Sequence, residues 1–275
     1  MTDLADLNTR KVLMEGLVAA ALKAGAEIWR IFEAGFEVEI KSDASPVTIA
    51  DRAAEAIILE ALLRLIPDVP VVAEEESAAG RVPDVAERFF LVDPLDGTKE
   101  FVRRGTDFTV NIGLIEHAAP TMGVIYAPAR GELYVGDVVT GEAWFRRDGE
   151  APSPMKVRPP HTPPVALASK SHDVPETEAY LRAIGCVERI SIGSSLKFCL
   201  LARGDADIYP RPSPTMEWDT AAGHAILLAA GGKAFAPSGK PLRYGKPDFF
   251  NPGFVATGGL DAPAIGAFME AAGAG

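Results

Sequence analysis

The chain has 275 residues, of which 48% are hydrophobic and 24% charged, and its formal net charge is -11. This length and composition are typical of a globular protein of one or two domains. The acidic excess argues against a nucleic acid polymer or an anionic membrane surface as the main partner.

No apolar run reaches the length of about 18 residues that a transmembrane helix needs. The first residues, MTDLADLNTRKVLMEG, lack the apolar segment of a signal peptide. The two cysteines, Cys186 and Cys199, offer neither a disulfide framework nor a metal-type spacing. We therefore expect a reduced, cytoplasmic protein without an integral membrane segment.

The spacing of apolar residues over 1–157 predicts a unit of helices followed by strands. Apolar residues at helical spacing indicate helices over 4–33 and 48–66, which end at Gly35 and Pro67. Alternating or apolar runs predict strands over 36–41, 70–74, 89–93, 108–117 and 120–128, with a hairpin from ELYVGD and EAWFRR after them.

Residues 158–164, RPPHTPP, are the best candidate for a linker, because proline excludes regular structure there. Beyond them, the strand segments VALAS, ERISIG, ADIYP and FVATGG alternate with the helical segments PETEAYLRAIG, SSLKFCLLARG, DTAAGHAILLAAGG and a last helix. We predict an α/β protein in the layered α+β sense. Its two halves would be a metal-binding half, 1–157, and a substrate half, 158–275.

Two carboxylates follow the apolar strand FFLVD. Asp93 ends that strand, and Asp96 lies in the turn PLDGT, which a helix start follows. Such close like charges disturb each other's pKa unless a cation lies between them. Carboxylates with a backbone carbonyl suit a hard ion such as Mg²⁺, whereas the EF-hand spacing is not met. A turn with solvated aspartates is the plain alternative.

Other acidic residues lie at the ends of predicted elements. The strand VVAEEES ends in Glu74, Glu75 and Glu76, of which strand alternation puts Glu75 on one face and the other two on the opposite face. Asp51, with Thr48, begins one helix, and Asp219 begins another. Each has an ordinary explanation as a solvated strand end, a capping box or an N-cap, so their combination is the informative feature.

The combination of PVTxAD, EES, DPLDGT and WDTAAG resembles the inositol monophosphatase superfamily of Mg²⁺-dependent, lithium-sensitive phosphatases, over residues 41–232. The segments DPLDGTKEF, SKSH (169–172), GSSLKFC (193–199) and PTMEWDTAAG resemble one branch, the 3′(2′),5′-bisphosphate nucleotidases. That branch removes the 3′-phosphate of adenosine 3′,5′-bisphosphate, a by-product of sulfate assimilation. The inositol branch typically has Thr-Asn-Phe in place of Lys99-Glu100-Phe101.

The resemblance implies a sandwich of alternating helix and sheet layers and a site for two or three Mg²⁺ ions. The implied ligands are the carbonyl of Leu95 and the carboxylates of Glu75, Asp93, Asp96 and Asp219. Among the three neighbouring glutamates, Glu75 is chosen because it stands two positions before Ser77, and the resemblance also implies a catalytic role for it. Thr98, hydrogen-bonded to Asp51, would orient and deprotonate a water that attacks phosphorus directly. The implied substrate-binding residues are Leu95, Asp96, Gly97, Thr98, His172, Ser194, Lys197 and Asp219.

The leading hypothesis is a Mg²⁺-dependent bisphosphate nucleotidase that forms AMP and phosphate. An inositol or sugar phosphatase acting on inositol 1-phosphate or fructose 1,6-bisphosphate is the alternative, because Pro212-Ser213 departs from the expected Leu/Phe-Gly-like pair beside the pocket. Arg211, nearby, is either a substrate contact or a solvated loop charge. A catalytically silent Mg²⁺ or phosphate module is disfavoured, since Asp51 and Thr98 serve water activation. Homodimers are common in this superfamily.

Overall fold

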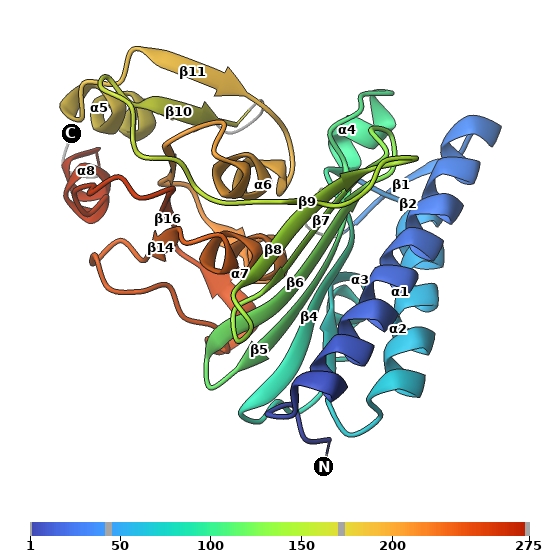
Figure 1. Cartoon of the computed structure of the whole chain (residues 1–275). Coiled ribbons are helices and arrows are strands. Elements are labelled where there is room, and N and C mark those ends of the chain that lie inside the picture. Colours follow the sequence, from blue (N-terminus) through green and yellow to red (C-terminus); the bar gives the residue numbers. More distant parts are fainter. Residues whose placement is uncertain (1, 42–45, 170–173, 273–275) are drawn as a thin grey trace.

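The computed structural model describes residues 2–41, 46–169 and 174–272, and it consists of alternating layers of helix and sheet (Figure 1). Helices α1 (Leu7–Ala34) and α2 (Ile49–Leu65) cover one face of a seven-stranded sheet. Helices α6 (Leu196–Arg203) and α7 (Ala221–Ala229) separate it from a five-stranded sheet, and α5 (Pro175–Ala183) and α8 (Gly266–Ala272) lie beyond. The predicted layered α/β architecture is confirmed.

The seven-stranded sheet belongs entirely to the first half of the chain. Its order is β3 (Val71–Ala73), β4 (Arg88–Asp96), β5 (Thr109–Glu116), β6 (Ala119–Ala127), β7 (Glu132–Asp137), β8 (Glu142–Arg147) and β9 (Ser153–Pro154). Only the β3–β4 pair is parallel among these neighbours. The predicted hairpin is the β7–β8 pair.

Strand β4 does not end at Asp93, as the sequence suggested, but continues to Asp96. Asp93 is opposite Asn111 and Asp96 is opposite Thr109, so β4 has one residue more than β5 between these pairs. Such an extra residue is a β-bulge, and Pro94, which has no N–H to donate to the ladder, lies within it. The bulge turns both aspartates toward the end of the sheet where the chain enters α4 (Thr98–Val102).

The second half forms the five-stranded sheet, in the order β11 (Glu188–Ser191), β10 (Val165–Ala168), β12 (Ile208–Arg211), β16 (Phe254–Thr257) and β14 (Lys233–Phe235). Two small pairs join β1 (Val38–Ile40) with β2 (Pro46–Thr48), and β13 (Thr215–Met216) with β15 (Phe250–Asn251). A short 3₁₀ helix spans Pro247–Phe249.

The two halves share the largest of the three hydrophobic clusters found among the described residues. Residues 158–164 contain no helix or strand, as predicted for a linker. However, buried side chains of β4, such as Leu91, belong to the same hydrophobic cluster as Phe198 of α6 and Phe254 of β16. A boundary near residue 157 therefore separates the two sheets but not the hydrophobic cluster that lies between them.

Glycines on the large sheet allow helix α7 to approach its backbone closely. A Cβ at Gly123 of β6 would lie 2.2 Å from the carbonyl oxygen of Ala222, and one at Gly136 of β7 would lie 2.5 Å from Cα of Ile226. Any larger side chain would push the helix away. This contact fixes the start of α7, and with it Asp219, relative to β4 and β5.

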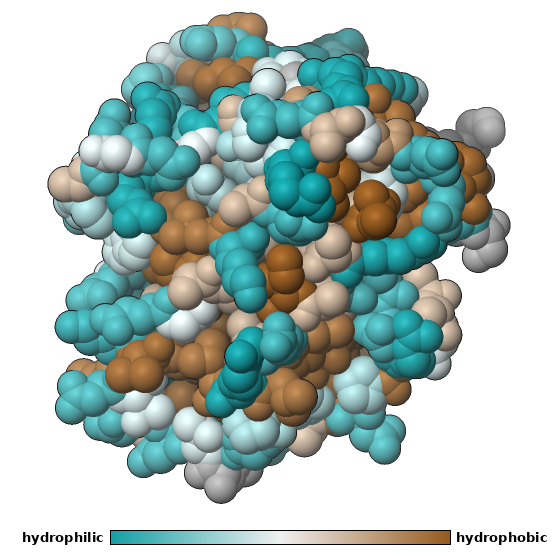
Figure 2. Space-filling model, turned by 90° about the vertical axis from the view of Figure 1, so that its right-hand side faces the viewer, coloured by the Kyte–Doolittle hydropathy of each residue, from teal (hydrophilic) through white to brown (hydrophobic). Residues whose placement is uncertain are grey.

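The outer face formed by α1 and α2 carries polar and apolar side chains interspersed (Figure 2). Val12 of α1 and Leu63 of α2 are among its exposed apolar residues. No helix within the described residues is both long and apolar enough to cross a membrane.

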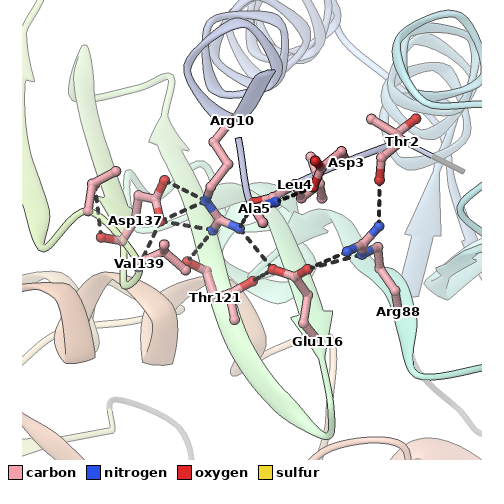
Figure 3. A network of polar contacts seen from close by, with 11 residues as sticks. Thr2, Asp3, Leu4, Ala5, Arg10, Arg88, Glu116, Thr121, Asp137 and Val139 are labelled. Atoms are coloured by element: carbon pink, nitrogen blue, oxygen red, sulfur yellow. Dashed lines mark hydrogen bonds and ion pairs between the residues drawn. The ribbon is translucent and has the colours of Figure 1, made fainter. Parts of the chain in front are cut away.

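A buried ion network fixes the start of α1 to the large sheet (Figure 3). Arg10 is 1% exposed; its Nε and Nη2 donate to Asp137, and its Nη1 donates to Glu116 at 2.9 Å. Arg88 at the start of β4 donates to the other oxygen of Glu116. The network therefore joins a helix to three strands at the end of β4 opposite Asp93 and Asp96.

Replacing Arg10 with methionine should lower the free energy of unfolding by about 3 kcal/mol, because removing one partner leaves buried carboxylates uncompensated. Urea denaturation at constant pH measures this loss. Arg30→Met is the matched control, since Arg30 forms a solvent-exposed pair with Glu27 on the same helix, and it should leave the midpoint unchanged. Equal midpoints for both variants would show that the network does not stabilise the fold.

Candidate active site

One cavity of about 270 Å³ lies between the two halves of the chain. The first half contributes Glu74, Asp93, Leu95, Asp96, Gly97, Thr98 and Lys99 to its lining, and the second half contributes Gly193, Ser194, Ser195, Lys197, Tyr209, Arg211 and Asp219. The structure thus brings together acidic residues and substrate-binding candidates that are far apart in the sequence.

The turn after Asp93 is held in place by a local hydrogen bond and by the conformation of Gly97. The Leu95 N–H donates to Asp93 Oδ1 at 3.0 Å. Gly97 has φ of 92°, a left-handed conformation that favours glycine, and a Cβ there would lie 2.7 Å from the carbonyl oxygen of Asp107. Helix α4 begins at the next residue, Thr98, which confirms the predicted helix start.

The glutamate that faces Asp93 is Glu74. Strand β3 ends at Ala73 and Glu74 is the first residue of α3 (Glu74–Ala78), so strand alternation no longer governs the three glutamates. Glu74 lines the cavity, whereas Glu75 is not among the lining residues. The structure therefore corrects the register that placed Glu75 at this position. Lys41 Nζ bridges the two, at 2.8 Å from Glu74 and 2.5 Å from Glu75.

Burial and mutual repulsion raise the pKa of three of these acids. Burial, opposed by Lys41, raises the pKa of Glu74 to about 7. Burial, then the charge of Glu74, raises the pKa of Asp93 well above its ordinary value. Burial, then the charge of Asp96, raises the pKa of Asp219 to about 6. A cation in the cavity would relieve this repulsion.

Asp219 does not cap helix α7, for which Thr220 is the N-cap residue. Its Oδ2 instead accepts hydrogen bonds from the Thr215 hydroxyl and, at 3.1 Å, from the Met216 N–H. The ordinary N-cap explanation is therefore wrong. The carboxylate is held by the β13 segment at the edge of the cavity.

Thr98 and Asp51 form the hydrogen bond that the resemblance implied. Thr98 Oγ1 lies 3.1 Å from Asp51 Oδ1 and 3.1 Å from the Leu95 carbonyl oxygen. Asp51 Oδ2 accepts from the Thr48 N–H and hydroxyl, each at 2.8 Å, in a complete capping box. Asp51 thus caps α2 and holds Thr98 at the same time, and burial raises its pKa to about 6.

The second half presents Ser194, Lys197 and Arg211 to the cavity. Ser194 donates to Asp96 Oδ2 at 2.6 Å. Lys197 is buried, and its Nζ donates to the carbonyls of Ile192 and Ser194 and lies 5.2 Å from the Tyr209 ring centroid.

Arg211 is not a solvated loop charge. It lines the cavity, and its buried Nε lacks a hydrogen-bond partner within the described part of the chain. His172 lies outside the described residues.

Sequence reasoning missed several polar residues that support the site. Asn111 Nδ2 lies 3.5 Å from Asp96 Oδ2, and Thr109 contacts Ser194 and Ser195. The available signal was that Thr109 and Asn111 are polar residues in the otherwise apolar strand FTVNIGLI. Lys41, which precedes the PVTxAD segment, also had no predicted role.

The donor set of the cavity is made of oxygen atoms, which suits Mg²⁺. Asp96 Oδ2 accepts from Ser194, Ser195 and Asn111, so Oδ1 is the atom that would face a cation. Within residues 2–41, 46–169 and 174–272, no three acidic, histidine or cysteine side chains are already grouped tightly enough to hold an ion.

Comparison with known proteins gives a consistent result over most of the chain. A model described as the inositol monophosphatase family matches residues 10–267. The chain is 45% identical over 248 residues to the 3′(2′),5′-bisphosphate nucleotidase CysQ of Salmonella typhimurium, covering 89% of this chain and 99% of the relative. Identity to the nucleotidase CysQ of Escherichia coli K12 is 44% over 245 residues, covering 88% and 98%.

Solved structures share the fold. The crystal structure of CysQ from Bacteroides thetaiotaomicron, a bacterial member of the inositol monophosphatase family, has a TM-score of 0.73 and 41% identity, covering 90% of this chain and 97% of that chain. The inositol monophosphatase of Anabaena has a TM-score of 0.71 and 26% identity, covering 94% and 98%. The predicted layered sandwich is therefore the one seen in these proteins.

In metal-free protein, Glu74→Gln should raise the free energy of unfolding by about 1 kcal/mol at pH 8. The wild-type carboxyl, whose pKa is raised to about 7, is ionised at that pH and is repelled by its neighbours. At pH 5 it is neutral in the fold but still largely ionised in the unfolded chain, so the gain should shrink steadily as the pH falls from 7 toward 4.5, the ordinary pKa of a glutamate. Urea denaturation with a chelator between pH 5 and 8 measures the difference.

Glu76→Gln provides the control, because the Glu76 carboxylate pairs with Arg81 on the surface and its pKa is lowered. That variant should show no gain at pH 8. If the gain in the free energy of unfolding of Glu74→Gln does not depend on pH, repulsion of the ionised Glu74 carboxylate is not its cause.

Proposed function

This chain belongs to the inositol monophosphatase family, and on that premise we propose that it is a 3′(2′),5′-bisphosphate nucleotidase. It would remove the 3′-phosphate of adenosine 3′,5′-bisphosphate and leave AMP and phosphate. The observation that carries the proposal is the Thr98–Asp51 hydrogen bond beside Glu74, Asp93 and Asp219 in a cavity shared by both halves. Identity to the nucleotidase relatives over most of the chain supports this substrate class.

The cofactor that fits this donor set is Mg²⁺, in two or three positions. The residues that would hold it are Glu74, Asp93, the Leu95 carbonyl, Asp96 and Asp219, with Glu74 in the place first given to Glu75. When bound, such ions lower the pKa of a coordinated water and neutralise charge on the phosphate. They also explain how a chain of net charge -11 binds a phosphate ester.

Water is the nucleophile in the reaction we propose. Thr98 donates a hydrogen bond to Asp51, so its hydroxyl oxygen is free to accept a hydrogen bond from the attacking water, and the proton that the water loses would pass through Thr98 to the Asp51 carboxylate. A new water oxygen–phosphorus bond forms, the bond from phosphorus to the 3′ oxygen breaks, and that oxygen gains a proton from solvent. Cys199 and His224 cannot substitute, since both are buried; burial raises the pKa of the thiol and lowers that of the imidazole to about 3.

The rest of the nucleotide would lie against the second half of the chain. Lys197 has three N–H donors, two of which go to backbone carbonyls, so one remains for a phosphate oxygen. Ser194 and Arg211 lie on the same wall. His172, Gly97 and the Leu95–Thr98 turn remain proposed substrate contacts.

Phosphate release from adenosine 3′,5′-bisphosphate, inositol 1-phosphate and fructose 1,6-bisphosphate, each with Mg²⁺ and with a chelator, tests the proposal. The nucleotide should be hydrolysed with the highest kcat/KM, and the chelator should abolish turnover. A preference for inositol 1-phosphate would replace the nucleotidase with the inositol phosphatase alternative.

The same assay tests the role of Thr98. Thr98→Ala should lower kcat for the nucleotide by roughly 100-fold and leave KM within a few-fold, because a group that orients water acts in the transition state. Thr106→Ala is the control, since Thr106 is exposed on the following loop and is not among the cavity-lining residues. An effect on KM alone would mean that Thr98 binds substrate instead.

A further inference from the structure

Asp107 lies between the two segments that form opposite walls of the cavity. It precedes β5, is 1% exposed, and is not among the residues that line the cavity. Its carbonyl oxygen would lie 2.7 Å from a Cβ at Gly97, and its own Cβ would lie 2.8 Å from a Cβ at Gly193. One residue therefore packs against the metal-side turn and the substrate-side loop, and each contact requires a glycine.

The Asp107 side chain is bonded on both sides. Its Oδ2 accepts the Gly193 N–H at 2.9 Å. Its Oδ1 accepts from Arg130, a partly exposed residue of the turn between β6 and β7. Charge-assisted hydrogen bonds of this kind are roughly twice as strong as neutral ones. The carboxylate is thus fixed to the large sheet through Arg130 and holds the backbone of the other half through Gly193.

The loop that begins at Gly193 carries several functional contacts. Ser194 Oγ and the Ser195 N–H both donate to Asp96 Oδ2, at 2.6 Å each. The carbonyls of Ile192 and Ser194 hold the Lys197 ammonium. A shift at Gly193 would therefore move the substrate-side cation relative to the carboxylates.

We infer that Asp107 is a positioning residue, which sets the spacing between the 93–98 turn and the 192–197 loop. It acts through Gly193 and does not itself touch the substrate. The inference rests on the proposed function only in taking the 192–197 loop as a substrate-binding wall. Asp96 keeps its place on β4 and its contact with Asn111 when this link is lost, so substrate binding, more than chemistry, depends on Asp107.

The test is Asp107→Asn, which keeps the side-chain volume but removes the negative charge that accepts hydrogen bonds from Arg130 and from the Gly193 N–H. Hydrogen–deuterium exchange of the substrate-free protein should be about 10-fold faster over residues 192–197, the factor expected for one weakened charge-assisted bond. KM for adenosine 3′,5′-bisphosphate should rise about 10-fold, while kcat changes by less than about threefold.

Asp207→Asn is the matched control. Asp207 is also a buried carboxylate that binds an arginine, Arg158, and a backbone N–H, that of Val165 at 2.7 Å, but it is not a cavity-lining residue. It should lower Tm without changing KM or the exchange of residues 192–197. If Asp207→Asn changes KM and the exchange of residues 192–197 as much as Asp107→Asn does, the effect of Asp107→Asn is general destabilisation and the inference is overturned.

A second pair of variants covers a failure of Asp107→Asn to fold. Gly193→Ala should raise exchange and KM in the same way, because its Cβ would meet Asp107, whereas Gly258→Ala, whose nearest contact would be an ordinary 3.4 Å, should not. Unchanged exchange over 192–197 in Gly193→Ala would overturn the inference. If wild type does not hydrolyse the nucleotide, the proposed function fails, and the exchange data alone decide on Asp107.

Discussion

The main constraint on this structure is that several carboxylates lie close together in one cavity and repel each other. Glu74, Asp93, Asp96 and Asp219 come from α3, the β4 bulge and the segment before α7, and no single element could bring them together. The fold tolerates this because Lys41 and local hydrogen-bond donors offset part of the charge. The remaining repulsion would be relieved by a cation, as the proposed function requires.

The layered fold supplies the rigidity that such crowding needs. The extra residue in β4 turns Asp93 and Asp96 outward at the end of a buried strand. Close packing of α7 on Gly123 and Gly136 fixes Asp219 against the same sheet. Because the halves share a core, the substrate wall and the metal wall are parts of one body, and Asp107 sets their separation at the point where they meet.

Much of this could be predicted from the sequence because it is local. Asp93, Asp96 and Thr98 lie within one turn, and Asp51 and Asp219 stand at helix starts that apolar spacing reveals. The identity of the cavity-facing glutamate could not be predicted, since it depends on the residue at which β3 gives way to α3. Asp107 could not be identified for another reason: its partner, Gly193, lies 86 residues away, and Asp107 itself belongs to no recognisable chemical pattern.

Calorimetric titration of Mg²⁺ into metal-free protein tests the central claim most directly. Repeating the titration in buffers of different ionisation enthalpy gives the number of protons released. With the pKa of Glu74 at about 7 and that of Asp93 raised, binding at pH 6.5 should release about one proton per chain. The release should fall at pH 8.5, where the Glu74 carboxyl is already ionised. Binding without proton release at pH 6.5, or no binding at all, would contradict the account.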